Sequence, residues 1–240
     1  GRRVLVRVDF NVPLDSSLNV QDDTRIRRAL PTIYTLLEGG ASVVLMSHLG
    51  RPKGKSAELS LQNIVPCLEK LIGKSVKFAS DCVGDLALEV TQNLKAGEVA
   101  LLENLRFHPE EKEGDEFFAG QLAENGDVYV NDAFGTAHRA HASTAIIARF
   151  FPEDKAFGEL MVAEIEALRK VMAKPSRPLL AIIGGAKVSS KLAILENMVE
   201  DVDRLMIGGG MAYTFILAKG GSVGASLVEE EMVERAVPSV

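Results

Sequence analysis

The sequence predicts an α/β protein built from parallel sheets that helices cover on both faces. Two observations predict this class: short β-branched runs recur along the chain, and most are separated by segments with apolar residues at helical spacing. Continuous apolar strands alternating with amphipathic helices are typical of parallel sheets, whose strands are buried on both faces. The 240 residues are 47% hydrophobic and 25% charged, which is a globular composition.

The expected strands are short runs rich in Val, Ile and Leu, at residues 4–8, 43–46, 76–78, 99–102, 128–130, 179–183 and 205–207. The expected helices span residues 25–37, 61–72, 117–122, 157–172 and 192–199. In the first helix, Ile26, Leu30, Ile33 and Leu37 lie three or four residues apart on one face, before two glycines end it. The second helix repeats this pattern and ends at Gly73.

A change in the residues that follow the strands indicates a domain boundary. The early strands are followed by Arg and His, whereas the last two are followed by Gly and Lys. Between the two groups lie the helix at 157–172 and a stretch bracketed by Pro175 and Pro178, which is typical of a domain connection. We expect a first lobe over residues 1–157, a connecting helix and hinge over 158–175, and a partial second lobe over 176–240 with only two strands.

The composition argues against several classes of function. Trp is absent, aromatic residues make up 5% and the net charge is −6, so stacking on nucleic-acid bases is not expected. Two cysteines exclude a disulfide framework and fit a reducing compartment. No apolar run approaches the roughly 18 residues that span a membrane. The first 60 residues carry nine basic and six acidic side chains, and this basic start in an acidic chain indicates a small anionic ligand.

Arginines follow several expected strands, and ligands of parallel sheets gather at the carboxyl ends of the strands. Guanidinium groups bind phosphate and carboxylate oxygens in pairs and stay charged at physiological pH. We therefore expect an anion pocket instead of a set of ordinary surface arginines. Its expected cations are Arg25, Arg51, Arg106 and Arg139, with Asn11 and His48 nearby.

The segment from Gly184 to Lys191 predicts a phosphate site in the second lobe. Its two glycines let the backbone approach a ligand, and the helix start that follows offers N–H groups. Lys187 and Lys191 are four residues apart and are expected on one helical face. The alternative is a tight turn with two solvated lysines. The spacing of His138 and His141 is weak support for a metal, and we expect no metal ligand in this chain.

Six motifs in order resemble the phosphoglycerate kinase family, most closely its bacterial members. They are Arg7 to Pro13, Ser47 to Pro52, Leu102 to Phe107, Asn131 to Arg139, Gly184 to Lys191 and Gly208 to Met211. The resemblance implies two Rossmann-like lobes. The first would bind 3-phosphoglycerate or 1,3-bisphosphoglycerate, and the second ATP or ADP with Mg²⁺.

The resemblance also implies residue roles on the matching motifs. The acid would contact Asp9, Phe10, Asn11, Arg25, His48, Leu49, Gly50, Arg51, Arg106 and Arg139. The nucleotide would contact Gly185, Lys187, Lys191, Gly208, Gly209 and Gly210. Arg25 would be catalytic at the carboxylate and the transferring group, and Lys187 at the phosphoryl in flight.

The implied reaction is reversible phosphoryl transfer between 1,3-bisphosphoglycerate and ADP, in glycolysis and gluconeogenesis, by a cytoplasmic monomer. Family members continue past residue 240, through the expected Mg²⁺ ligand, and begin a few residues earlier. We therefore expect a chain truncated at both ends that is inactive alone. The alternatives are a non-catalytic anion-binding α/β module and, behind it, an NAD-dependent dehydrogenase.

Overall fold

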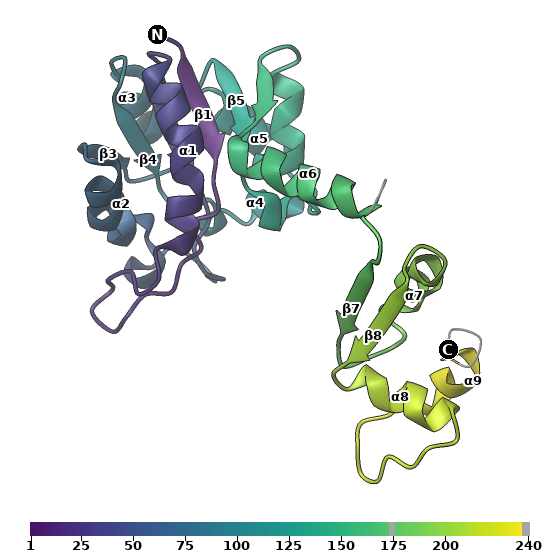
Figure 1. The fold of residues 1–240 in the computed structure, drawn as a ribbon. Helices are drawn as coiled ribbons and strands as arrows, with labels where there is room; N and C mark the ends of the chain where they lie inside the picture. Colours follow the sequence, from purple (N-terminus) through teal and green to yellow (C-terminus); the bar gives the residue numbers. More distant parts are fainter. Residues whose placement is uncertain (173–175, 237–240) are drawn as a thin grey trace. The chain divides into compact units, whose positions relative to one another are not determined.

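The chain forms two compact units, Gly1–Ala167 and Leu168–Val240. The computed structural model describes residues 1–172 and 176–236 (Figure 1). The division between the units falls inside the segment 158–175 in which the sequence places the connecting helix. The assignment of that segment as a hinge stays a prediction.

The first unit contains a six-stranded sheet in the order β3-β4-β2-β1-β5-β6, and every pair of neighbours is parallel. The strands are β1 (Arg3–Arg7), β2 (Ser42–Met46), β3 (Val76–Ala79), β4 (Val99–Leu102), β5 (Val128–Asn131) and β6 (Lys155–Phe157). The chain first builds the sheet to one side of β1 and then returns to its other side at β5. The carboxyl ends of β1 and β5 therefore border the position at which the strand order reverses, where ligands of such sheets bind.

Strand β6 was not expected, because its three residues are all exposed and form no apolar run. As a result, the helix expected at 157–172 begins two residues later, as α6 (Glu159–Met172). The helix expected at 61–72 is divided into a 3₁₀ turn, Leu61–Ile64, and α2 (Val65–Ile72). Pro66 lies in the first turn of α2, where a residue without an N–H group is tolerated, which fits an α-helix that begins at Val65.

The remaining helices of the unit are α1 (Thr24–Glu38), α3 (Asp85–Gln92), α4 (Glu110–Glu113) and α5 (Glu116–Ala123). Short 3₁₀ turns lie at Ala57–Leu59, Leu105–Phe107, Phe134–Thr136 and Ile147–Phe150, and a π-helical turn lies at Ala142–Ile146. Helices α3 and α4 were not among the expected elements.

Helices cover both faces of the six-stranded sheet. Side chains alternate along a strand, so Val6 and Leu5 of β1 belong to two separate clusters. Val6 lies in the cluster with Ile33 of α1, and Leu5 lies in the cluster with Phe118 of α5. The predicted α/β class, with a parallel sheet covered on both faces, is confirmed for this unit.

The second unit contains a parallel pair of strands, β7 (Leu180–Gly184) and β8 (Arg204–Gly208). Its helices are α7 (Leu192–Val199), α8 (Met211–Ala218) and α9 (Val233–Ala236), with a 3₁₀ turn at Glu230–Met232. Val188, Leu195 and Phe215 form part of its core. On the strands, however, Ile182 and Met206 are 68% and 54% exposed. One face of this two-stranded sheet is therefore exposed among the described residues.

Neighbouring phenylalanines of α5 test the packing of the first unit. Phe118 is 3% exposed, and Phe117 is 76% exposed. Phe118→Ala should lower the free energy of unfolding by about 3–5 kcal/mol, because it removes a buried ring and leaves a cavity. Phe117→Ala, the matched control, should change it by less than about 1 kcal/mol. Urea unfolding measures both, and equal effects would contradict the assigned burial.

Candidate functional site

A pocket of about 300 Å³ lies at the carboxyl edge of the first sheet. Loops that follow β1, β2, β4 and β5 line it, together with the first turn of α1. All four arginines that were expected to converge line this one pocket. The lining residues are Asp9, Asn11, Arg25, His48, Gly50, Arg51, Arg106, Gly135, Thr136 and Arg139.

Two expected contact residues do not line the pocket. Phe10 and Leu49 are buried in the first hydrophobic cluster. Their backbone N–H groups hold the loops instead: Phe10 donates to Ser47 Oγ at 2.8 Å, and Leu49 donates to Asn104 Oδ1 at 3.1 Å. The side chains of Phe10 and Leu49 thus pack in the core, and their backbone connects the loops that carry the pocket.

Gly135 and Thr136 line the pocket although neither is among the expected contacts of the acid. Both lie within the Asn131 to Arg139 motif, and their position after β5 is the sequence feature from which they could have been predicted as pocket residues. A Cβ atom at residue 135 would lie 3.1 Å from Asp9 Oδ2. Glycine at this position thus allows the loop after β5 to approach the loop after β1 closely.

The buried amide of Asn104 joins the loops after β2 and β4. Its Oδ1 accepts hydrogen bonds from the backbone N–H groups of Leu49 and Arg106, each at 3.1 Å. Its Nδ2 donates to the carbonyl oxygens of Leu49 and Leu59, each at 2.8 Å. All donors and acceptors of this side chain are therefore used, as burial requires.

The backbone of Gly50 connects two other lining residues, Asn11 and Arg106. Its N–H donates to Asn11 Oδ1 at 2.8 Å, and its carbonyl oxygen accepts from Arg106 Nη1 at 2.8 Å. Its φ of +63° is left-handed, and a Cβ atom there would lie 2.8 Å from Leu59 Cδ2. Only glycine suits both conditions without strain.

The charges of the lining favour an anion. Four guanidinium groups face one carboxylate, that of Asp9, which pairs with Arg25 Nη1 at 2.8 Å. Burial, and then the charges of Arg7 and Arg139, lower the pKa of Arg106. Among the described residues, Arg106 Nε is buried without a hydrogen-bond partner. An unpaired buried donor on a cation of the pocket lining is what an oxygen-rich anion would satisfy.

His48 contributes a neutral ring to the pocket. Burial, and then the nearby positive charge of Arg7, lower its pKa from 6.5 to about 2. Its imidazole is therefore uncharged at neutral pH, and it offers hydrogen bonding without adding to the repulsion among the arginines.

Two glycine-containing loops lie together at the carboxyl edge of the second sheet. Gly184 and Gly208 are paired across β7 and β8, and the N–H of Met211 donates to the carbonyl oxygen of Gly185 at 2.8 Å. A Cβ atom at Gly209, whose φ is +71°, would lie 2.9 Å from that same oxygen. The expected nucleotide contacts Gly185, Gly208, Gly209 and Gly210 thus come from adjoining loops.

The expected helical placement of Lys187 and Lys191 is wrong. Residues 189–191 form a turn, Lys187 precedes it, and α7 begins at Leu192. Val188 is buried in the core of the unit, and its carbonyl oxygen accepts a hydrogen bond from the N–H of Lys191 at 2.8 Å. This hydrogen bond closes a turn directly before α7 begins.

Comparisons with known proteins identify the family of the chain. The family model described as phosphoglycerate kinase matches residues 1–238. The chain belongs to the phosphoglycerate kinase family. Curated phosphoglycerate kinases from Moorella thermoacetica and Anaeromyxobacter dehalogenans are 58% and 55% identical over 234 and 239 residues. These alignments include 97% and 98% of this chain.

Solved structures lead to the same family. The phosphoglycerate kinase of Coxiella burnetii is 40% identical, with a TM-score of 0.87 over 100% of this chain. That of Pyrococcus horikoshii is 35% identical, with a TM-score of 0.82 over 99% of this chain. This chain covers 60% and 62% of those two chains, and 59% and 60% of the two curated relatives. Among the described residues, no helix is both long and apolar enough to cross a membrane.

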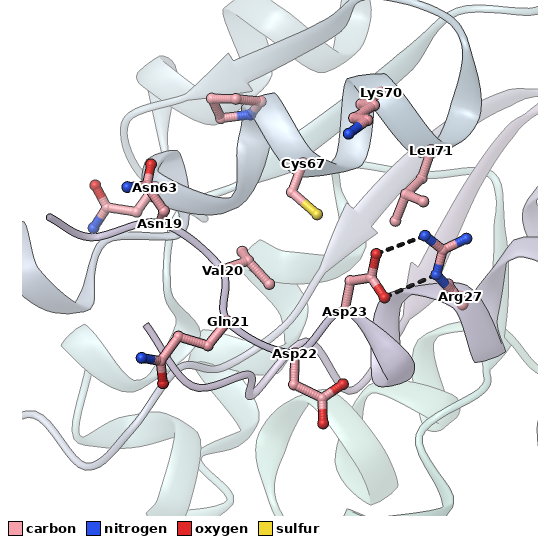
Figure 2. A pocket seen from close by; sticks show the side chains of 11 residues that line it. Asn19, Val20, Gln21, Asp22, Asp23, Arg27, Asn63, Cys67, Lys70 and Leu71 are labelled. Atoms are coloured by element: carbon pink, nitrogen blue, oxygen red, sulfur yellow. Dashed lines mark hydrogen bonds and ion pairs between the residues drawn. The ribbon is translucent and has the colours of Figure 1, made fainter. Parts of the chain in front are cut away.

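Figure 2 shows a larger cavity, of about 540 Å³, whose lining contains no residue of the six family motifs. The segment 19–23 and residues of α1 and α2 line it. Its most conspicuous charges neutralise each other, because Arg27 donates to both carboxylate oxygens of Asp23 at 2.8 Å. Burial raises the pKa of the Cys67 thiol, which keeps it protonated. We assign no chemistry to this cavity.

One group of metal-ligand types, Asp81, Cys82 and His108, occurs among the described residues. Its ligand atoms are already used or unsuitable. Asp81 Oδ1 accepts from His108 Nε2 at 2.8 Å and from the N–H of Cys82 at 2.7 Å, while the Lys55 ammonium lies 3.9 Å from Asp81 Oδ2. The Cys82 thiol is buried in an apolar cluster. The group is best described as a half-buried ion pair.

This ion pair predicts a pH dependence of stability. The hydrogen bond that His108 donates to the Asp81 carboxylate raises the pKa of His108 above 6.5. The resulting stabilisation is present in full below the unfolded pKa and is lost as pH rises through the higher folded pKa. We expect a contribution of about 0.5–1 kcal/mol to the free energy of unfolding at about pH 5.5, lost at about pH 9.

Urea unfolding of the wild type and of Asp81→Asn at both pH values measures this contribution. The difference between the two proteins should shrink as pH rises. A difference that is constant, or that grows with pH, would contradict the assignment.

Proposed function

We propose that the whole protein catalyses reversible phosphoryl transfer between 1,3-bisphosphoglycerate and ADP, and that the first unit of this chain binds the three-carbon acid. The observation that carries the proposal is the convergence of Arg25, Arg51, Arg106 and Arg139 on one pocket of about 300 Å³. The relatives named above are phosphoglycerate kinases and match nearly the whole of this chain. The two free cysteines fit a reducing compartment, and we place the reaction in the cytoplasm.

The charge of the ligand matches the lining. A phosphate and a carboxylate together carry about −2.5 to −3 at neutral pH. We assign Arg51, Arg106 and Arg139 to the phosphate, since they come from loops after three different strands and can approach it from several directions. Asp9 and Asn11, which follow β1, then hold the hydroxyl end.

Arg25 is assigned to the carboxylate and the group being transferred. It lies in the first turn of α1, its side chain is half exposed, and Asp9 orients its guanidinium at 2.8 Å. The attacking carboxylate is already ionised at neutral pH, so the reaction requires no general base. Catalysis then consists of positioning and of neutralising charge in the transition state.

The loops of the second unit suit the phosphates of a nucleotide. Lys187 and Lys191 supply positive charge, and a Cβ atom at Gly208 would meet no atom within 4 Å, so its surface is open. Bound with Mg²⁺, the nucleotide would accept or donate the phosphoryl group, and Lys187 would neutralise that group during transfer. Lysines and glycines are not Mg²⁺ ligands, so we assign no metal ligand to these loops.

Binding of the acid can be measured directly on this chain. Calorimetry should show binding of 3-phosphoglycerate, and Arg51→Ala should weaken it by about 10–100-fold, because a charge-assisted contact of about 1.5–3 kcal/mol is lost. Arg27→Ala is the matched control, because Arg27 pairs with Asp23 outside this pocket, and it should leave the affinity unchanged.

Titrations with NAD and with inorganic phosphate complete this test. Binding of NAD in place of the acid would favour a dehydrogenase. Equal affinity for inorganic phosphate and 3-phosphoglycerate would favour a general anion-binding module over the proposed function.

Kinetics of the whole protein separate the roles of two arginines. Arg25→Ala should lower kcat by roughly 10²–10³-fold, because its contact develops with the transition state. Arg106→Ala should mainly raise KM, because it holds a phosphate that does not react. Equal losses of kcat in the two variants would contradict this division of roles.

A further inference from the structure

A buried guanidinium lies directly behind the pocket. Arg7, the last residue of β1, is 0% exposed, yet it does not line the pocket. Burying a charge costs several kcal/mol unless it is paired and hydrogen-bonded. Because Arg7 does not line the pocket, contact with the acid cannot compensate its burial, and other residues must pair with its guanidinium.

Glu111 and Ser143 supply the compensation. Arg7 Nε donates to Ser143 Oγ at 2.8 Å, and that hydroxyl donates in turn to Glu111 Oε1 at 2.6 Å. Glu111 Oε2 accepts from the N–H of Ser143 at 2.9 Å, and Glu111 Oε1 lies 3.9 Å from Arg7 Nη2. Glu111 is itself fully buried, in the short helix α4. The three residues form a unit that holds the guanidinium in one orientation.

Of the two terminal nitrogens of this guanidinium, Nη1 donates to the carbonyl oxygen of Val8 and Nη2 faces His48. Arg7 Nη2 lies 3.2 Å from His48 Nδ1. A guanidinium has donors only, so His48 Nδ1 must be the acceptor and carries no hydrogen. A neutral imidazole has one hydrogen, which is therefore on Nε2. The ring is neutral, because burial and the surrounding positive charges lower its pKa to about 2.

We propose that Arg7, held by Glu111 and Ser143, is a positioning residue that fixes His48 as its Nε2–H tautomer, so that the pocket presents a neutral N–H donor to an oxygen of the acid. The inference rests on the proposed function of the pocket. Among the described residues, His48 Nε2 has no hydrogen-bond partner, which leaves this donor for a ligand.

A neutral donor has a physical advantage at this place. Four guanidinium groups already line the pocket, and a fifth cation would add to their mutual repulsion before a ligand arrives. An N–H donor of fixed direction adds a hydrogen bond without that cost. The fixed N–H of His48 also selects ligands that have an oxygen acceptor at one position, whereas a mobile cation would not select for position.

The double variant Arg7→Met with Glu111→Gln tests the inference and removes both buried charges together, so that neither is left unpaired. Long-range ¹H–¹⁵N NMR of His48 at about pH 7 reports which ring nitrogen carries the hydrogen. The wild type should show a bare Nδ1 and a protonated Nε2, and the double variant should show a mixture of tautomers. The control, Arg27→Met with Asp23→Asn, removes an exposed pair and should leave the His48 signals unchanged.

Affinity for 3-phosphoglycerate separates positioning from a structural role. The double variant should bind about tenfold more weakly than the wild type, the equivalent of about 1.4 kcal/mol. A glutamine at 48 places an amide N–H near the position of Nε2 without needing a tautomer. In the His48→Gln background, the same two substitutions should therefore weaken the binding of 3-phosphoglycerate by less than about twofold.

Three results would overturn the inference: a protonated Nδ1 in the wild type, an unchanged tautomer in the double variant, or an equal loss of affinity in both backgrounds. If the wild type bound neither 3-phosphoglycerate nor inorganic phosphate, the proposed function would fail. The NMR spectra would still decide the tautomer, so the two failures are distinguishable.

Discussion

The pocket depends above all on the buried amide of Asn104, whose two polar atoms make four hydrogen bonds to the chain around the loops after β2 and β4. With these loops joined, Gly50 can bond to Asn11 on one side and to Arg106 on the other. The side chains that face the pocket are thus carried by backbone that has little freedom to move. Such preorganisation keeps charged groups in place before a ligand arrives.

Concentrating positive charge at one sheet edge requires compensation, and the structure supplies it in two layers. At the surface, Asp9 pairs with Arg25. Behind the pocket, Glu111 offsets the buried Arg7. Burial, and then the positive charge of Arg7, lower the pKa of His48, so its ring is neutral. The residual positive charge is therefore directed into the cavity, where a phosphate and a carboxylate can neutralise it.

The motifs were predictable from the sequence because they follow strands, and parallel strands end at a shared edge. The pattern of short apolar runs identified the fold class, and eight of the ten expected acid contacts line one pocket. The pattern failed where burial decided the local structure. The side chains of Phe10 and Leu49 lie in the core, and a turn after the buried Val188 places Lys191 before α7 instead of within it. Strand β6 has no apolar run, so the sequence pattern did not predict it.

The uneven charge along the chain pointed to an anion, although of the early cations only Arg25 and Arg51 line the pocket. The sequence by itself therefore determined the family, the α/β class and the residue types at the strand ends, since these are local properties of the chain. Only the tertiary structure decided which side chains face the cavity and how Arg7 orients His48. Those contacts join residues 41 or more positions apart, and no local pattern specifies them.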